Sequence, residues 1–345
     1  MRRGWIVAVA GVLLLVILPY STLTLPGLFP GALNSPGTLQ LLALCLLFAG
    51  FALSYDLLFG QTGLLSFGHA LYVAAGSYSA NIAVTKLGWS LPAGILLAVV
   101  VGVVLPAALG AVALRVQGIA FAMVTLAFAQ VGSILVHADP GRLTGGEEGL
   151  SLAPAATPGF LAGVANTVNL YWLALAYLVL VAVIVRWAVD SEPGRVWQAI
   201  RENERRVTVL GLHPYRFRLL AYVLASLLAT LGGVVHLLLQ GGSTPQITTS
   251  NFTLGLLVMV VLGGLGSRWG AILGGVLYTY LDHRLAALGT WDVIADLPRA
   301  VRAPLSEPLF VLGVLFVAVV YFMPGGLAGL PARLRSRLAE RSGNA

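Results

Sequence analysis

The stretch from Gly194 to Tyr222, GRVWQAIRENERRVTVLGLHPYRFRLLAY, is the only long polar segment in a chain that is otherwise almost entirely apolar. Its spacing predicts a helix with charged residues over most of its surface and one apolar face, formed by Trp197, Ile200, Val207 and Leu210. Hydrophobic runs lie directly before and after it. A charged amphipathic helix between two membrane spans favours docking onto a soluble partner.

Composition places the rest of the chain in a membrane. Of its 345 residues, 58% are hydrophobic and 10% are charged, whereas a soluble domain averages about 25% charged residues. The 41 glycines are typical of helices that pack closely, because small residues let backbones approach each other. The net charge of +7 comes mostly from arginines between the hydrophobic runs, so it does not indicate nucleic-acid binding. The sequence therefore predicts an all-α, polytopic integral membrane protein.

Ten apolar runs predict ten membrane spans. They lie near residues 5–20, 38–59, 68–86, 91–114, 118–137, 169–188, 217–240, 253–266, 270–288 and 306–323. With the N-terminus inside, basic residues favour the cytoplasmic side by about three to one, as the positive-inside rule requires. Both ends of the chain are therefore predicted to be cytoplasmic.

These spans form one predicted transmembrane domain over residues 1–330. It carries a cytoplasmic segment over 190–216 and a long external loop over 139–169, and a basic cytoplasmic tail follows over 331–345. The start of the chain, MRRGWIVAVAGVLLLVILPYS, has the basic end and short apolar core of a signal peptide. Because no small-x-small cleavage site follows promptly, we expect an uncleaved first span.

A glycine-rich stretch, GQTGLLSFGHALYVAAGSYSAN (Gly60–Asn81), is polar for its predicted membrane depth. Irregular backbone is tolerated there only beside a cavity or inside protein. One interpretation is that the stretch lines a translocation path, with Gln61, Gly63, Ser66, Gly68, His69, Tyr72, Tyr78 and Asn81 as the lining residues. The alternative is close helix packing with the polar groups paired internally. A similar G-L-x-S pattern recurs in Gly263–Tyr278, so an internal repeat is a further hypothesis.

Enzymatic chemistry finds little support in the sequence. Ser66 and His69 suggest a serine hydrolase, but the nucleophile-elbow motif needs glycine two residues before the serine, and Leu64 stands there. Asp56, the apparent third partner, lies at a predicted helix end. A P-loop needs Gly-Lys-Ser/Thr, and the sole lysine, Lys86, lies between Thr85 and Leu87. Any ATP and magnesium must therefore be used by partner subunits, and we expect this chain to bind no cofactor.

Metal binding and ion-coupled transport are also disfavoured. His137 with Asp139, and Asp282 with His283, have no further ligand at suitable spacing, so no metal site is expected. Ion-coupled carriers often place carboxylates deep in the membrane, and here the acids fall at span ends or in loops. Sodium sites built from carbonyl and hydroxyl oxygens escape this test.

Several blocks of sequence resemble the permease subunits of branched-chain amino-acid ABC importers, of the LivM type. They are GLLSFGHALYVAAGSYSAN, FAMVTLAFAQ, LTGGEEGL, RENERRVTVLGLHPYRFRLLAYVLASLLATLGGVVHLLLQGGSTPQ, LLVMVVLGGLGSRWGAILGGVL and FMPGGLAGL. They extend from about residue 50 to 330 in the family's order. The resemblance implies an ABC importer permease fold, a second, LivH-like permease, two cytoplasmic ATPase subunits and an external substrate-binding protein. It also implies multi-pass insertion in the plasma (inner) membrane of a prokaryote.

The resemblance further implies that the polar stretch couples the chain to an ATPase, through Arg201, Glu202, Glu204, Arg205 and Gly211. The family's coupling motif has an acidic residue, small residues and then a glycine. Glu204 and Gly211 match its ends, but Arg206 and Val207 stand where alanines are usual. This departure puts the fine contacts in doubt and leaves the coupling role in place.

The predicted function is thus a permease subunit that forms, with a second permease, the path for branched-chain or other hydrophobic amino acids. The absence of candidate charges deep in the path fits a neutral or zwitterionic solute. Related permeases serve urea, amides or aromatic acids, so these solutes are the alternative. A secondary transporter, which would work without ATPase partners, is a further one.

Overall fold

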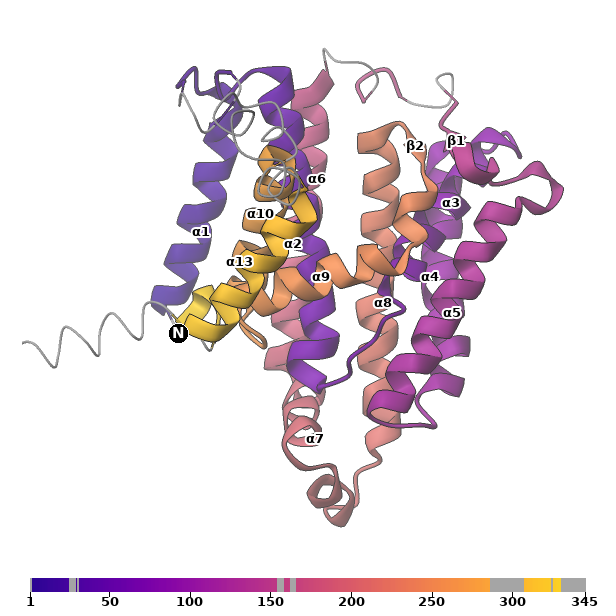
Figure 1. Ribbon diagram of the computed structural model, residues 1–345, viewed down its shortest axis with the longest axis vertical. Coiled ribbons are helices and arrows are strands. Elements are labelled where there is room, and N and C mark those ends of the chain that lie inside the picture. Colours follow the sequence, from indigo (N-terminus) through magenta and orange to yellow (C-terminus); the bar gives the residue numbers. More distant parts are fainter. Residues whose placement is uncertain are drawn as a thin grey trace, which may run out of the picture.

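The computed structural model describes residues 2–24, 29, 31–153, 158–161, 166–285, 307–323 and 325–329. They form a helical bundle (Figure 1), which agrees with the predicted all-α class. Its longer helices are α1 (Arg2–Ile17), α2 (Pro36–Asp56), α3 (His69–Thr85), α4 (Leu91–Ala113), α5 (Ile119–Ala138), α6 (Thr167–Asp190), α7 (Glu192–Val209), α8 (Pro214–Gln240), α9 (Ser250–Gly263), α10 (Arg268–Leu285) and α13 (Pro308–Phe322). Short helical turns are η1 (Leu18–Tyr20), η2 (Leu57–Gln61), η3 (Pro140–Arg142), η4 (Gly146–Glu148), η7 (Pro245–Thr248) and η9 (Leu327–Gly329).

Six helices of the described chain are long and apolar enough to cross a membrane. They are Pro36–Gln61, Leu91–Ala113, Ile119–Ala138, Thr167–Asp190, Pro214–Gln240 and Phe310–Gly329. The other four predicted spans fall on the shorter helices α1, α3, α9 and α10. The chain is thus a multi-pass helical membrane protein, and the count of ten spans stays a prediction.

The core of the bundle is built around α2 and α8, most of whose residues are buried inside the chain. Helix α2 packs against α6, α8, α9 and α10, and α8 packs against α3 and α4. Aromatic rings fill the space between them, and Phe51 contacts Tyr177 and Phe252 edge to face. In contrast, α4, α5 and α13 keep most of their apolar surface outside. Lipid or other subunits must cover these outer faces.

Close packing of α3 on α8 depends on glycines that face the partner backbone. A Cβ added at Gly76 of α3 would overlap the carbonyl of Thr230 on α8, and one added at Gly233 of α8 would overlap the carbonyl of Val73. No side chain fits between backbones at this separation. The glycine content predicted such contacts, and this pair of helices contains them.

The end of the bundle opposite α7 carries a small cap. Strand β1 (Leu150–Ser151) pairs antiparallel with β2 (Gly242–Ser243), which follows α8. Before β1, the Asp139 carboxylate accepts hydrogen bonds from the backbone N–H and the hydroxyl of Thr144, at 2.7 and 2.8 Å. The backbone N–H bond is the main cause that lowers the pKa of Asp139. The described part of the predicted loop 139–169 is therefore folded onto the bundle, while residues 154–157 and 162–165 lie outside the described residues.

The predicted amphipathic helix forms α7, but it is not straight. Asn203 has φ −160° and ψ 100°, so the helix breaks there into two parts. The Asn203 side-chain oxygen accepts a hydrogen bond from the N–H of Arg206 at 3.2 Å, as an N-cap residue does, and so starts the second part. Helix α7 ends at Val209 and Leu210 is its C-cap residue, so the prediction that Leu210 lies on the apolar face is wrong. Leu210 is 78% exposed, whereas Trp197, Ile200 and Val207 are buried as predicted.

The α3–α8 contact can be tested with a Gly76→Ala variant. Since the added methyl group overlaps a backbone carbonyl, we expect the free energy of unfolding to fall by about 1–3 kcal/mol. Unfolding in mixed micelles with increasing SDS measures this change. The control is Gly37→Ala near the start of α2, where no atom lies within 4 Å of the added Cβ. Equal stability of the two variants would contradict the close contact.

Candidate functional site

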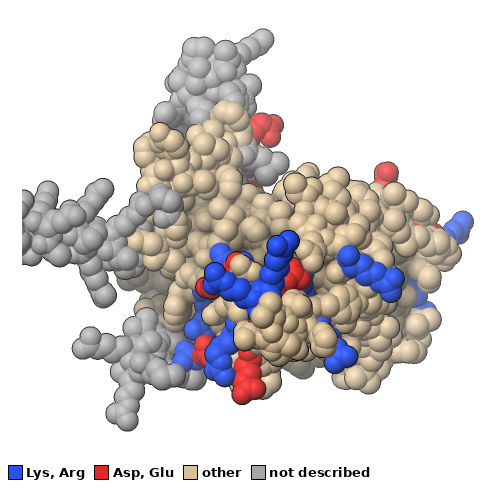
Figure 2. Space-filling view, turned by 90° about the horizontal axis from the view of Figure 1, so that it is seen from below, with Lys and Arg blue, Asp and Glu red and all other residues tan. Residues whose placement is uncertain are grey.

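Helix α7 and its two connections project from one end of the bundle, below α6 and α8 in Figure 1. Figure 2 shows this end face on, and charged side chains of both signs gather over its middle while the surface around them is largely uncharged. Residues 190–218, which include the projecting segment, carry ten of the 33 charged residues of the chain. Such a face suits contact with a soluble protein and excludes burial in lipid.

The first part of α7 is fastened to the bundle by one buried aromatic side chain. Trp197 is 1% exposed, and its indole N–H donates to the Phe217 carbonyl at the start of α8, at 2.8 Å. The second part is fastened by an ion pair. Both guanidinium NH₂ groups of Arg218 donate to the two carboxylate oxygens of Glu204, at 2.8 and 2.9 Å. A bidentate pair of this kind adds directional as well as electrostatic stabilisation.

The tip beyond these anchors exposes apolar side chains. Val209 is 87% exposed and Leu210 is 78% exposed, although they follow a charged segment outside the membrane spans. Gly211 comes next with φ +81°, in the left-handed region that favours glycine. Exposed aliphatic groups on a projecting polar segment are typical of a protein-binding surface.

The five residues predicted to couple the chain to an ATPase therefore fall into two groups. Glu202, Arg205 and Gly211 lie on the surface. Arg201 and Glu204 instead use their charged groups within the chain: Arg201 donates to the Gly60 carbonyl, and Glu204 pairs with Arg218. The first group can contact a partner directly, while the second holds α7 against the bundle.

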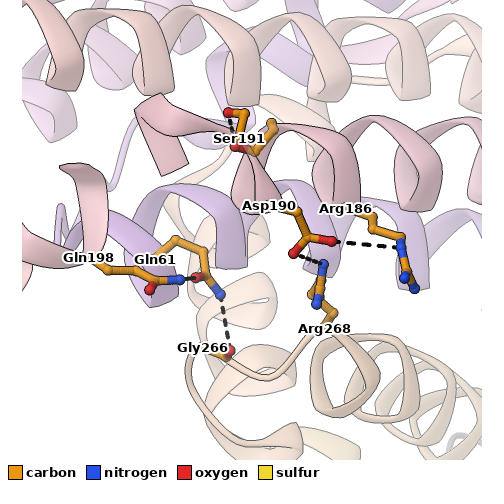
Figure 3. A network of polar contacts seen from close by, with 8 residues as sticks. Gln61, Arg186, Asp190, Ser191, Gln198, Gly266 and Arg268 are labelled. Atoms are coloured by element: carbon orange, nitrogen blue, oxygen red, sulfur yellow. Dashed lines mark hydrogen bonds and ion pairs between the residues drawn. The ribbon is translucent and has the colours of Figure 1, made fainter. Parts of the chain in front are cut away.

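The sequence predicted no role for Arg218. It also did not predict the network of polar contacts between α7 and the bundle, which Figure 3 shows. Gln198 donates from Nε2 to Oε1 of Gln61 at 3.3 Å, and Gln61 donates from Nε2 to the Gly266 carbonyl at 3.0 Å. Beside them, Asp190 accepts from Arg268 at 3.1 Å and lies 3.7 Å from Arg186. The sequence offered one indication that Arg268 has a role, which is its position among glycines between two predicted spans.

Between α2 and α3 the chain leaves the helical conformation. Helix α2 continues into the π-helical turn η2, and residues 63–68 are irregular. In Figure 1 this segment rises from the lower end of α2 to the middle of the bundle, where α3 begins. The glycine-rich stretch therefore contains irregular backbone, and its role as the lining of a path stays a prediction.

Side chains of the bundle satisfy the backbone of this segment. Tyr55 donates to the Ser66 carbonyl at 2.9 Å, and the Phe67 N–H donates to the Thr125 hydroxyl at 3.1 Å. At the start of α3, the Ala70 N–H donates to the Thr253 hydroxyl of α9 at 3.0 Å. Buried hydroxyls from three helices thus replace the hydrogen bonds that a continuous helix would supply.

Ser66 and His69 do not form a catalytic pair. The Ser66 hydroxyl accepts from the Gly68 N–H at 3.1 Å, and His69 Nε2 lies 2.9 Å from the Ser54 hydroxyl. His69 Nδ1 has no hydrogen-bond partner in the described chain, and Asp56 bonds to Gly266 instead. The sequence argument against a hydrolase agrees with this geometry.

The eight residues proposed to line a path lie at three levels of the bundle. Gln61 and Gly63 lie beside the first part of α7, and Ser66, Gly68, His69 and Tyr72 lie in the middle. Tyr72 is buried and its hydroxyl lies 2.7 Å from that of Tyr222. Asn81 lies at the opposite end, where it donates to the Leu150 carbonyl at 2.6 Å and so holds the cap. Tyr78 is also buried, and its hydroxyl has no partner among the described residues.

The structure thus brings together only the middle group of these residues. All four are buried inside this chain. Whether any of the eight contacts a solute stays a prediction.

The fold defines a multi-pass helical membrane protein with a charged segment that projects from one end of the bundle. A family model described as "Branched-chain amino acid transport system / permease component" matches residues 37–320. The chain belongs to this family.

Individual relatives agree with this assignment. The chain is 29% identical over 272 residues to the high-affinity branched-chain amino acid transport system permease protein LivM of Escherichia coli, an alignment that covers 70% of this chain and 62% of LivM. It is 26% identical over 333 residues to LivM of Salmonella typhimurium, covering 90% and 74%. Escherichia coli LivH is 26% identical over 307 residues, covering 82% and 92%. The chain therefore spans less than two thirds of Escherichia coli LivM, and no solved structure was found to match it.

The support of the unwound segment can be tested at Thr253. A Thr253→Val variant keeps the side-chain shape but leaves the buried Ala70 N–H without its partner. We expect this loss to cost about 1–3 kcal/mol of unfolding free energy. A Thr253→Ser variant keeps the hydroxyl and should retain most of the stability. If serine and valine destabilise equally, the hydroxyl does not support the start of α3.

Proposed function

We propose that this chain is a permease subunit of an ATP-driven importer in the plasma (inner) membrane of a prokaryote. It forms one transmembrane domain over residues 1–330, with ten spans and both ends in the cytoplasm. The observation that carries the proposal is the exposed tip of α7 in a chain that belongs to a transport permease family. The tail 331–345 lies outside the described residues.

The tip of α7 fits an ATPase subunit as its partner. The sequence carries no P-loop, so ATP and magnesium are bound by two cytoplasmic ATPase subunits. Val209, Leu210 and the exposed charges of Glu202 and Arg205 form the docking surface. Closure of the ATPases on ATP then moves α7 and changes the path between outward-facing and inward-facing states.

A second permease completes the path. The chain is similar both to proteins named LivM and to one named LivH, which supports a pair of related permeases. The apolar outer faces of α4, α5 and α13 are available for such a partner as well as for lipid. An external binding protein delivers the solute to the end of the bundle opposite α7.

Branched-chain or other hydrophobic amino acids are the proposed solutes. Relatives named as branched-chain amino acid transport permeases support this class. A secondary transporter is not favoured, because this chain belongs to a family of permease components, which work as parts of a larger transport system. The decisive experiment screens ligands of the binding protein and then measures uptake by the reconstituted complex. Uptake of a branched-chain amino acid that requires ATP supports the proposal, and uptake by this chain alone contradicts it.

Gly211 offers a sharper test of docking. Its φ of +81° suits glycine, and no atom lies within 4 Å of an added Cβ, so a new side chain would point into the docking surface. We expect Gly211→Trp to leave membrane insertion intact and to abolish co-purification with the ATPases. Gly211→Asn is the control, since asparagine tolerates the left-handed region and is small. Unaltered co-purification and transport by the tryptophan variant would refute the docking assignment.

A further inference from the structure

The turn between α9 and α10, residues 264–267, is held by groups from α2 and η2. The Gly266 N–H donates to Oδ1 of Asp56 at 2.8 Å, and the Gly266 carbonyl accepts from Gln61 at 3.0 Å. Both backbone groups of one glycine are therefore bound by side chains about 200 residues earlier in the sequence. Gly266 has φ +77°, so the turn needs glycine at this position.

The first part of α7 binds the same place from outside. Arg201 donates to the Gly60 carbonyl, and Gln198 donates to Gln61 at 3.3 Å. Gln61 thus lies between α7 and Gly266, with its oxygen turned to one and its nitrogen to the other (Figure 3). A second connection runs beside it, from Asp190 at the end of α6 to Arg268 at the start of α10.

The packing of η2 against the α9–α10 turn leaves no room for a side chain at position 60. A Cβ added at Gly60 would overlap the Asp56 carboxylate and would lie 2.6 Å from the Gly266 nitrogen. Movement of η2 must therefore displace the turn or break its hydrogen bonds. Since hydrogen bonds are directional, the bonded turn follows η2 in translation and in rotation.

Burying the Asp56 carboxylate to hold this turn costs free energy. Asp56 is 0% exposed, and its Oδ2 has no partner among the described residues. A buried charged group costs free energy unless it is fully paired, and charged groups in membrane proteins are typical of functional elements.

We propose that Gln61 and Asp56 are positioning residues that tie the α9–α10 turn to the docking helix, so that the turn moves with α7 when the ATPases close. This inference rests on the proposed docking of α7 to an ATPase subunit. Gln198 and Arg201 carry the movement of α7 to η2. Gln61 and Asp56 carry it from η2 to Gly266, and so to α9 in the middle of the bundle.

The functional test uses the complete importer in proteoliposomes and measures ATP hydrolysis and solute uptake together. Gln61→Leu and Gln198→Leu each interrupt the Gln198–Gln61–Gly266 branch of the connection with a side chain of similar size, while the bonds made by Arg201 and Asp56 remain. We expect both to keep co-purification with the ATPases and ATP hydrolysis, while uptake per ATP falls by about tenfold. The double variant should be no worse than either single one, because both act on one connection. Gln240→Leu, at the opposite end of α8, is the matched control and should keep the wild-type ratio.

A second measurement does not depend on how well the variants fold. Spin labels are placed at the exposed positions Leu265, Ala199 and Leu135 in a Cys45→Ala background, and distances are measured before and after trapping with ATP and vanadate. We expect the distance from 265 to 199 to stay constant while both positions shift relative to 135. A turn that stays in place while position 199 moves overturns the connection.

The outcomes separate this inference from the proposed function. If the wild-type complex transports with ATP but the Gln61 and Gln198 variants keep the wild-type ratio, the connection alone is wrong. If the wild-type chain does not co-purify with ATPase subunits, the docking proposal fails and the connection fails with it.

Discussion

The structure depends on one constraint, that backbone polar groups inside an apolar bundle must find partners without water. Between α2 and α3 the helical hydrogen bonds are interrupted, because residues 63–68 are not helical. Hydroxyls of Tyr55, Thr125 and Thr253 supply the missing hydrogen bonds. These hydroxyls lie on α2, α5 and α9, so the requirement fixes how three helices surround the start of α3.

Glycines lie where the backbones of two segments approach each other closely. Gly76 and Gly233 bring α3 against α8 at a distance that no side chain permits, and Gly60 does the same for η2 and the α9–α10 turn. Close backbones allow hydrogen bonds from one segment to the main chain of another. In a protein with few charged residues, such contacts supply much of the specificity of packing.

The charged residues that do occur are divided between two tasks. Some fasten α7 to the bundle, as Arg218 does with Glu204, and their charges are used within the chain. Others stay on the exposed face together with Val209 and Leu210. A docking helix needs both, because a contact can transmit movement only if the helix is firmly attached on its other side.

The sequence by itself determined the helical membrane class of the fold and the position of the polar segment that forms α7. Composition, span length and glycine spacing depend on neighbours in sequence, and such local properties can be read directly. Sequence patterns did not predict the conformation of Asn203 or the partners of Gln61 and Asp56. A polar residue in a helical pattern gave no sign of the break at Asn203, and none that the helix ends at Val209 and leaves Leu210 exposed. The partners of Gln61 and Asp56 lie at Gly266 and Gln198, far along the chain, and only the packing of α2, α7 and the α9–α10 turn brings them within hydrogen-bonding distance.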